Sequence, residues 1–219
     1  MQLRRKRTTL LLSVILAAGG CQRHTEFVSR GPAVPPAPIV RPLPDNASPQ
    51  LKHMLEGAIA QAGVTTGYDP SYVALDYPNG DVPETTGVCS DVVVRALRKS
   101  GIDLQKEVHE DMKAVRSAYP NKWGAINPDR NIDHRRVLNL MTYFTRQGKA
   151  LPISSTAADY QPGDIVAWEL TSGIDHIGIV TNMLSNSEDR YLIVHNIGAG
   201  TRIEDVLFAW TIKGHYRFF

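Results

Sequence analysis

Cys89 is the residue of this sequence whose type and position most clearly suggest chemistry. It opens the stretch CSDVVVRALRKSG, where it and four apolar residues repeat at helical spacing. This pattern predicts an amphipathic helix between a turn at Gly87 and a C-cap at Gly101. A thiol in the first turn has two interpretations. It is either a small apolar residue of the core-facing stripe, or a nucleophile whose thiolate is stabilised by the helix N-terminus.

Two histidines offer the base and the orienting group that a cysteine nucleophile needs. Residues 164–168, 176–180 and 191–195 read as strands, and a polar loop, 181–190, joins the last two. Pairing Val180 with Tyr191 places His176 directly opposite His195 on one face of the sheet. A helix packed on that sheet would bring Cys89 to them.

Two polar residues beside these histidines offer alternative roles. Asn196 is a rival orienting residue, but strand alternation turns it to the face opposite His195. Asp175 could influence His176, and otherwise reads as a loop carboxylate. We therefore expect a Cys89–His176–His195 triad.

The elements that must position this triad lie in one predicted domain, residues 51–219. The chain has 219 residues, 42% of them hydrophobic, and a net charge of +2. The first twenty residues hold four basic and no acidic side chains, so the charge of the remainder is −2. This balance argues against nucleic acid as a partner.

Residues 1–21 resemble a secretory signal. A basic cluster, residues 4–7, precedes an apolar segment too short to span a bilayer, and Ala18-Gly19-Gly20-Cys21 resembles a bacterial lipoprotein processing site. This resemblance implies a lipid anchor on Cys21, and glutamine at position 22 favours the outer membrane. The alternative is an ordinary cleaved signal with a spare cysteine. Residues 22–50 hold seven of the 14 prolines and predict an extended tether.

The order of these motifs resembles that of the NlpC-type cell-wall peptidases, which share a papain-like core. GVCSDVV, PGDIVAW, HIGIV and IVHN carry the resemblance. It implies an α+β fold with the cysteine-bearing helix packed on an antiparallel sheet. It also implies Cys89 as nucleophile, His176 as base and His195 as the orienting residue, with a thiolate–imidazolium pair at the start of the reaction. Tyr77 matches a tyrosine that often lines such sites.

Residues 64–219 more closely resemble an uncharacterised bacterial domain family of that superfamily. Its segments include YDPSY, LDYPNGDVPETTGVCSDVV, NIDHRRV and EDVLF. Asp91 stands where the peptidases have glycine after Cys-Ser, so it is a candidate supporting residue. Residues 105–160 form an insertion before the PGD strand. These departures affect the expected substrate pocket more than the expected chemistry.

The resemblance and the signal segment together imply a secreted cysteine amidase or peptidase that acts on peptidoglycan stem peptides without a cofactor. Its location would be the periplasmic side of the cell envelope. The same thiol chemistry would serve an acyltransferase or a thioesterase. A non-catalytic binding module that keeps the fold is a further alternative.

A metal hydrolase is the rival from another class of enzyme. The insertion contains the possible ligands His109, Glu110, Asp111, Asp133 and His134. Neither HExxH nor paired-cysteine spacing supports zinc, so we expect no metal. These residues otherwise read as an ion-pair network or a scaffold for a substrate loop, and Arg135 and Arg136 could clamp a carboxylate.

Overall fold

The structure is a computed structural model that describes residues 37–124, 127–187 and 189–219. The predicted signal segment, Cys21 and most of the predicted tether lie outside these ranges. The four helices of the described ranges are α1 (Pro49–Ile59), α2 (Cys89–Lys99), α3 (Leu104–Ala114) and α4 (Val137–Arg146), with short 3-10 helices at Arg116–Ala118, Asp133–Arg135 and Ala157–Asp159. Within those ranges, no helix has the length and apolarity needed to cross a membrane.

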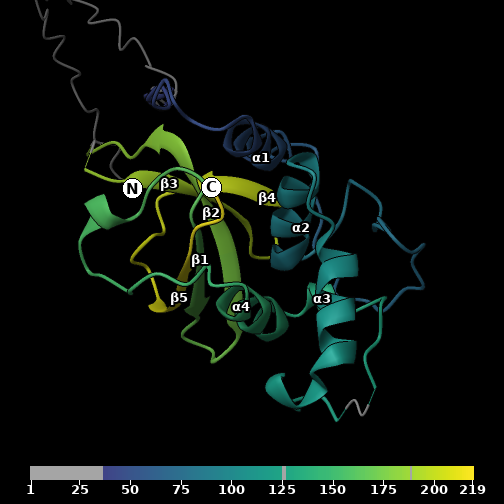
Figure 1. Cartoon of the computed structure of the whole chain (residues 1–219). Coiled ribbons are helices and arrows are strands. Elements are labelled where there is room, and N and C mark those ends of the chain that lie inside the picture. Colours follow the sequence, from purple (N-terminus) through teal and green to yellow (C-terminus); the bar gives the residue numbers. More distant parts are fainter. Residues whose placement is uncertain (1–36, 125–126, 188) are drawn as a thin grey trace, which may run out of the picture. The chain divides into compact units, whose positions relative to one another are not determined.

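The five strands form one antiparallel sheet in the order β4-β3-β2-β1-β5. They are β1 (Ile165–Glu169), β2 (Asp175–Leu184), β3 (Tyr191–Asn196), β4 (Thr201–Glu204) and β5 (Thr211–Tyr216). Figure 1 shows the helices gathered to one side of this sheet. The predicted α+β class is therefore confirmed.

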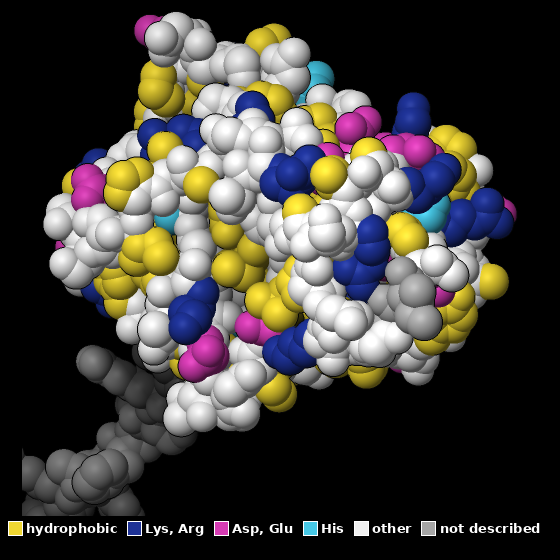
Figure 2. Space-filling model, turned by 60° about the horizontal axis from the view of Figure 1, so that its bottom comes forward, with side chains coloured by type: hydrophobic (Ala, Val, Ile, Leu, Met, Phe, Trp, Pro, Cys, Tyr) yellow, Lys and Arg dark blue, Asp and Glu magenta, His cyan; other side chains and the backbone are white. Residues whose placement is uncertain are grey.

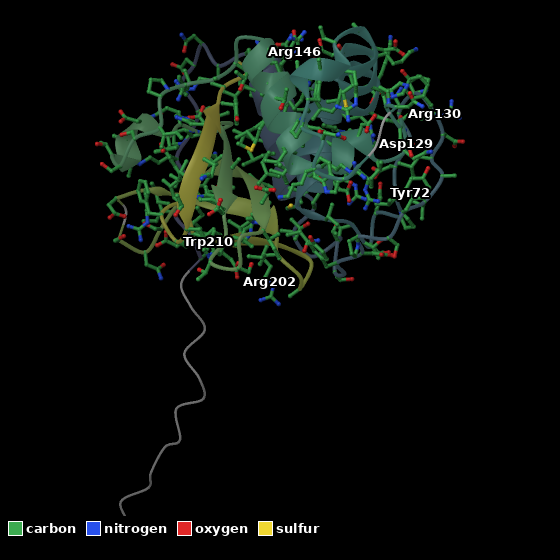
Figure 3. The ribbon with its side chains drawn as sticks, turned by 90° about the horizontal axis from the view of Figure 1, so that it is seen from below. Tyr72, Asp129, Arg130, Arg146, Arg202 and Trp210 are labelled. Atoms are coloured by element: carbon green, nitrogen blue, oxygen red, sulfur yellow. The ribbon has the colours of Figure 1, made fainter. Side chains whose placement is uncertain are left out.

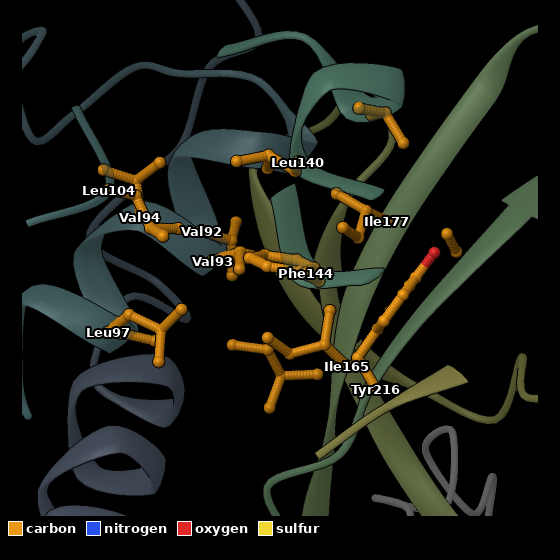
Figure 4. Close-up of a cluster of buried hydrophobic side chains, with 14 of the residues drawn as sticks. Val92, Val93, Val94, Leu97, Leu104, Leu140, Phe144, Ile165, Ile177 and Tyr216 are labelled. Atoms are coloured by element: carbon orange, nitrogen blue, oxygen red, sulfur yellow. The ribbon is translucent and has the colours of Figure 1, made fainter. Parts of the chain in front are cut away.

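The period of two along each strand divides the sheet into two apolar faces. On the helical face, Ile177, Ile179 and Val194 pack with α2 and α4. Figure 4 shows this core, in which Val92, Val93, Phe144, Ile177 and Tyr216 are labelled. On the other face lies a separate cluster that contains Val166, Trp168, Val180, Ile193 and Leu207.

The helix around Cys89 begins where the sequence predicts. The Asp91 carboxylate accepts a hydrogen bond of 2.7 Å from the backbone N–H of Val88 and so caps the first turn. The predicted apolar stripe from Cys89 to Leu97 is buried against the sheet. Full burial of one such valine or leucine stabilises the fold by about 1.5–3 kcal/mol. Gly101 follows the last turn with φ of 94°, a conformation that favours glycine.

The predicted pairing of β2 with β3 is wrong by two residues. Val180 lies opposite Ile193 rather than Tyr191, and an irregularity separates Val180 from Leu184. The cause is that β2 continues to Leu184, so the turn closes at residues 185–190 instead of 181–190. A shift of two preserves the face of every side chain. His176 and His195 therefore still share a face, although they are not directly opposite.

Residues 37–50, which the sequence assigns to the tether, lie against the domain. Val40 bridges Met183, and the backbone N–H of Arg41 donates 2.8 Å to the carbonyl of Asn182. The Ser48 hydroxyl accepts from the backbone N–H of Leu51 at 3.1 Å and caps α1. The N-terminal segment thus joins the domain at the end of β2.

Candidate functional site

The Cys89 thiol lies beside the backbone at the start of β2. The side chain is buried, with 5% of the residue exposed, and its sulfur accepts a hydrogen bond from the backbone N–H of Ile177. Burial raises the pKa of Cys89 to about 12. The Asp91 charge adds to this rise, against hydrogen bonds from the N–H groups of Ile177, Ser90 and Cys89 itself. The thiol is therefore protonated at neutral pH.

The two predicted histidines form a hydrogen-bonded pair that continues to a glutamate. His176 Nε2 lies 2.9 Å from His195 Nδ1, and His195 Nε2 lies 3.0 Å from Glu204 Oε2. The rings of Trp168 and Trp210 have centroids 5.8 and 5.6 Å from that of His176. Burial lowers the pKa of His176 to about 3, and a charge on His195 would lower it further. His176 is therefore neutral at pH 7.

The Cys89 thiol and the His176 ring both lie next to Ile177 of β2, but on different faces of the sheet. Ile177, whose N–H binds the sulfur, packs on the helical face with Cys89. His176 precedes it and points to the tryptophan face. In the described ranges no hydrogen bond joins Cys89 to either histidine. Burial disfavours both charges, so these pKa shifts favour a neutral thiol and a neutral imidazole over the expected thiolate–imidazolium pair.

A groove of about 650 Å³ opens beside Cys89. Its lining includes Tyr68 and Tyr72 from the loop before α2, Trp123 and Arg136 from the insertion, and Ile174 and Asp175 at the start of β2. Tyr72 and Ile174 are each 59% exposed, and Tyr68 and Trp123 each 40%. Figure 2 shows one face of the molecule on which such hydrophobic side chains lie among charged ones. Exposed apolar side chains that gather at a hollow are typical of a binding site.

The cationic side chains that line the groove differ in whether they form an ion pair with a carboxylate. The guanidinium of Arg136 lies 4.3 Å from the centroid of the Trp123 ring. The charges of Asp133 and Asp129 act on it, but no carboxylate of the described residues lies within ion-pair distance. Lys122 instead pairs with Asp175 at 2.9 Å. Arg136 is consequently the cation in the groove that remains available for an anionic ligand.

Asp91 and Arg135 fix the wall of the groove. Their buried pair has a shortest distance of 3.0 Å, and Arg135 also donates to the carbonyls of Asp69 and Ser71. The Tyr72 hydroxyl of the groove donates a hydrogen bond of 3.0 Å to the Asp129 carboxylate. Figure 3 shows Tyr72 and Asp129 close together and well apart from Trp210. Asp91 is therefore a supporting residue of the helix start and of the loop that bears the two tyrosines.

Asn196 and Tyr77 have roles other than contact with the histidines. As expected from alternation, Asn196 faces away from His195: its amide donates to the carbonyls of Gly67 and Gly87, each at 3.1 Å. Tyr77 does not line the groove, since its hydroxyl donates to Glu110 at 2.7 Å.

Tyr68 is the tyrosine beside the thiol, and sequence reasoning missed it. Burial raises its pKa to about 12, and the charges of Cys89 and Asp91 would raise it further. The residue lies in the YDPSY segment, but only the folded loop brings it to the groove. Its hydroxyl remains protonated at neutral pH and can donate a hydrogen bond.

Four of the five possible metal ligands of the insertion lie beside protein groups, whereas the buried Nδ1 of His134 has no hydrogen-bond partner among the described residues. Asp111 pairs with Arg146, Glu110 accepts from Tyr77, and His109 lies 3.5 Å from Asp133. Across the described part of the chain, no three histidine, cysteine or carboxylate side chains gather in a way that could hold a metal ion. These residues join α3 to neighbouring loops.

Comparison with known proteins places the sequence beside one curated relative. It is 48% identical over 214 residues to the Escherichia coli (strain K12) protein named "Uncharacterized protein YijF", and the match covers 98% of each chain.

Two solved structures are also similar. One is a lipoprotein-like protein of the NLP/P60 family from Staphylococcus aureus, with 16% identity, a TM-score of 0.38 and coverage of 75% of this chain. The other is NlpC1 from Trichomonas vaginalis, with 12% identity, a TM-score of 0.42 and coverage of 80%. The matches span 41% and 46% of those two chains, less than half of each.

Most of the described domain matches one family. Residues 55–218 fit the family described as "Domain of unknown function (DUF1287)". This range includes α2, all five strands and every residue of the groove. The chain therefore belongs to the DUF1287 family.

Proposed function

We propose that this protein is a cysteine hydrolase that cleaves an amide bond in the stem peptides of peptidoglycan. One observation carries the proposal. His176 binds His195 through Nε2, and its Nδ1 has no hydrogen-bond partner among the described residues. Its neighbour Ile177 holds the sulfur of Cys89. A nitrogen base without a partner thus lies on the strand that contacts a buried thiol.

The reaction begins with neutral groups. Because no hydrogen bond joins Sγ to His176, the reaction requires the entering substrate to bring the two groups together. His176 Nδ1 then takes the thiol proton while Sγ bonds to the substrate carbonyl carbon and the carbonyl π pair moves to oxygen. The Tyr68 hydroxyl donates to this oxyanion. When the oxyanion collapses, the C–N bond breaks and Nδ1 gives its proton to the leaving amine. Water then hydrolyses the thioester and restores the thiol and the neutral imidazole.

The groove supports a peptide with a carboxylate close to the scissile bond. Tyr68, Tyr72 and Trp123 offer apolar surface, and Arg136 offers a guanidinium without an acidic partner. Stem peptides carry such carboxylates. The signal-like residues 1–21 support a cell-envelope location, with Cys21 as the site of a lipid anchor in the outer membrane.

A non-catalytic binding module is the second candidate, and the protonation state favours it. A thiol with a pKa of about 12 and no imidazole hydrogen bond resembles a buried structural cysteine. Acyl transfer or thioester hydrolysis would use the same steps as the amidase, with another acceptor or acyl donor.

The deciding experiment incubates purified peptidoglycan with wild type, Cys89→Ser and His176→Ala, followed by mass analysis of soluble fragments. In parallel, cosedimentation with peptidoglycan is compared between wild type and Arg136→Ala. New amine termini with wild type alone would support the hydrolase and identify the bond. Absence of fragments with every protein, together with Arg136-dependent cosedimentation with peptidoglycan, would replace it by the binding module.

A further inference from the structure

Glu204 ends a chain of hydrogen bonds that begins at His176. The three side chains come from β2, β3 and β4 and lie on the same face of the sheet. His195 has no exposed side-chain surface, whereas the Glu204 side chain is 38% exposed. The chain therefore runs from the buried base to the edge of the sheet.

The hydrogen-bonding rules for each group determine where the protons lie. A carboxylate only accepts, so His195 Nε2 must donate to Glu204. A neutral imidazole with a proton on Nε2 has a lone pair on Nδ1, so His195 Nδ1 accepts from His176 Nε2. His176 then has its lone pair on Nδ1. This is the tautomer that a base acting through Nδ1 requires.

We propose that Glu204 is a positioning residue that sets the tautomers of His195 and His176, and so keeps His176 Nδ1 free to accept a proton. The assignment of tautomers follows from the contacts alone, while its catalytic consequence rests on the proposed function. Glu204 touches neither thiol nor groove, and it acts through His195.

Two substitutions separate tautomer control from charge. In Glu204→Gln the amide oxygen can still accept from His195 Nε2, so the tautomers remain although the charge is lost. In Glu204→Ala the acceptor is removed, and each ring can adopt either tautomer. Glu169→Gln is the matched control, because Glu169 is also a half-exposed strand glutamate but pairs with Lys213 at the surface.

The experiment records the ring ¹⁵N shifts of His176 and His195 by NMR in the full chain and its three variants. We expect Nε2–H at both rings in wild type, Glu204→Gln and the control, and mixed tautomers in Glu204→Ala. An Nδ1–H tautomer of His176 in wild type, or unchanged tautomers in Glu204→Ala, would overturn the proposal.

A kinetic readout then tests the consequence of the tautomers. General-base catalysis contributes roughly 10²–10⁴-fold, so Glu204→Ala should lower kcat by about tenfold or more with KM unchanged, and Glu204→Gln should restore most of it. If the tautomers respond as expected but no protein releases peptidoglycan fragments, the role of Glu204 stands and the hydrolase function falls. If fragments appear and kcat is the same in Glu204→Ala as in wild type, the positioning role falls while the hydrolase stands.

Discussion

The side-chain amide of Asn196 donates to the carbonyl of Gly87, two residues before the thiol of Cys89. A second bond from the same amide reaches Gly67, and the Asn196 carbonyl accepts from the backbone N–H of Gly198 at 3.2 Å. One fully buried residue at the end of β3 thereby holds both segments that lead into the groove wall and the helix start.

Loss of these bonds should destabilise the fold. Asn196→Ala removes the donor to the Gly67 carbonyl and one of two donors to the buried Gly87 carbonyl, which also accepts from the backbone N–H of Asp69. A buried group left without its partner costs about 1–3 kcal/mol. We expect a fall of that size in the free energy of unfolding, measured by urea titration. Asn182→Ala is the control, because its bond to the Arg41 carbonyl is exposed. Equal effects of the two substitutions would contradict the assigned role.

The thiol should behave as a neutral group in solution. Since the pKa of Cys89 is raised to about 12, the thiolate fraction and the iodoacetamide rate should rise about tenfold per pH unit from pH 6 to 10. The measurement uses a Cys21→Ser chain, so that only Cys89 reacts. In urea the same thiol should level off above its ordinary pKa of about 8.5. A plateau near neutral pH in the folded protein would instead indicate a preformed thiolate–imidazolium pair.

Arg136 should determine preference for a carboxylate. A hydrogen bond to a charged group contributes about 1.5–3 kcal/mol, which corresponds to roughly 10- to 150-fold in affinity. Arg136→Ala should therefore weaken calorimetric binding of a stem peptide with a free carboxylate by about that factor, and leave the amidated peptide unaffected. Arg130→Ala is the control, since its guanidinium lies over Tyr77 outside the groove. Retained preference in Arg136→Ala would remove this residue from the binding site.

Asp164 should make the fold sensitive to acid. Burial alone would raise its pKa, but hydrogen bonds from Arg217 and His215, at 2.6 to 2.7 Å, outweigh it and lower the pKa. A lowered pKa stabilises the fold above the unfolded value of about 3.9, and this stability is lost as the pH falls through the folded pKa. Asp164→Asn should cost about 3–5 kcal/mol at pH 7.

The pH series also provides the control for Asp164. Urea unfolding from pH 7 to pH 2.5 should show the difference between wild type and Asp164→Asn shrinking below about pH 3.9. Asp205→Asn removes an exposed ion pair with Arg190 and should change stability by less than about 1 kcal/mol at every pH. A constant difference for Asp164→Asn would show that the ion pairs of its carboxylate do not stabilise the fold.

The periodicity of apolar residues correctly predicted the features that depend on local backbone geometry. The three- and four-residue spacing after Cys89 identified the buried side of α2, and the period of two identified the shared face of His176 and His195. The predicted face of the two histidines is correct although the predicted register is wrong, because the register is shifted by an even number of residues. Asn196 was likewise placed on the correct face.

Features that depend on contacts between distant segments were beyond the sequence. Asp91 and Arg135 are 44 positions apart, so their pair and the loop that it holds had no local signal. Tyr68 reaches the groove through that loop, whereas Tyr77, chosen by its position before the cysteine, turns to Glu110. The protonation of Cys89 follows from burial, which spacing does not give.

The attachment of residues 39–41 to the end of β2 has a mechanical consequence. Leu184 and Ile177 are seven residues apart, about 23 Å along the strand, so the N-terminal segment enters the domain far from the thiol. A pull on that segment would first load the hydrogen bonds between residues 39–41 and 182–184. The strain would be taken up at that end of the sheet, and the groove could stay open while the protein is held under tension.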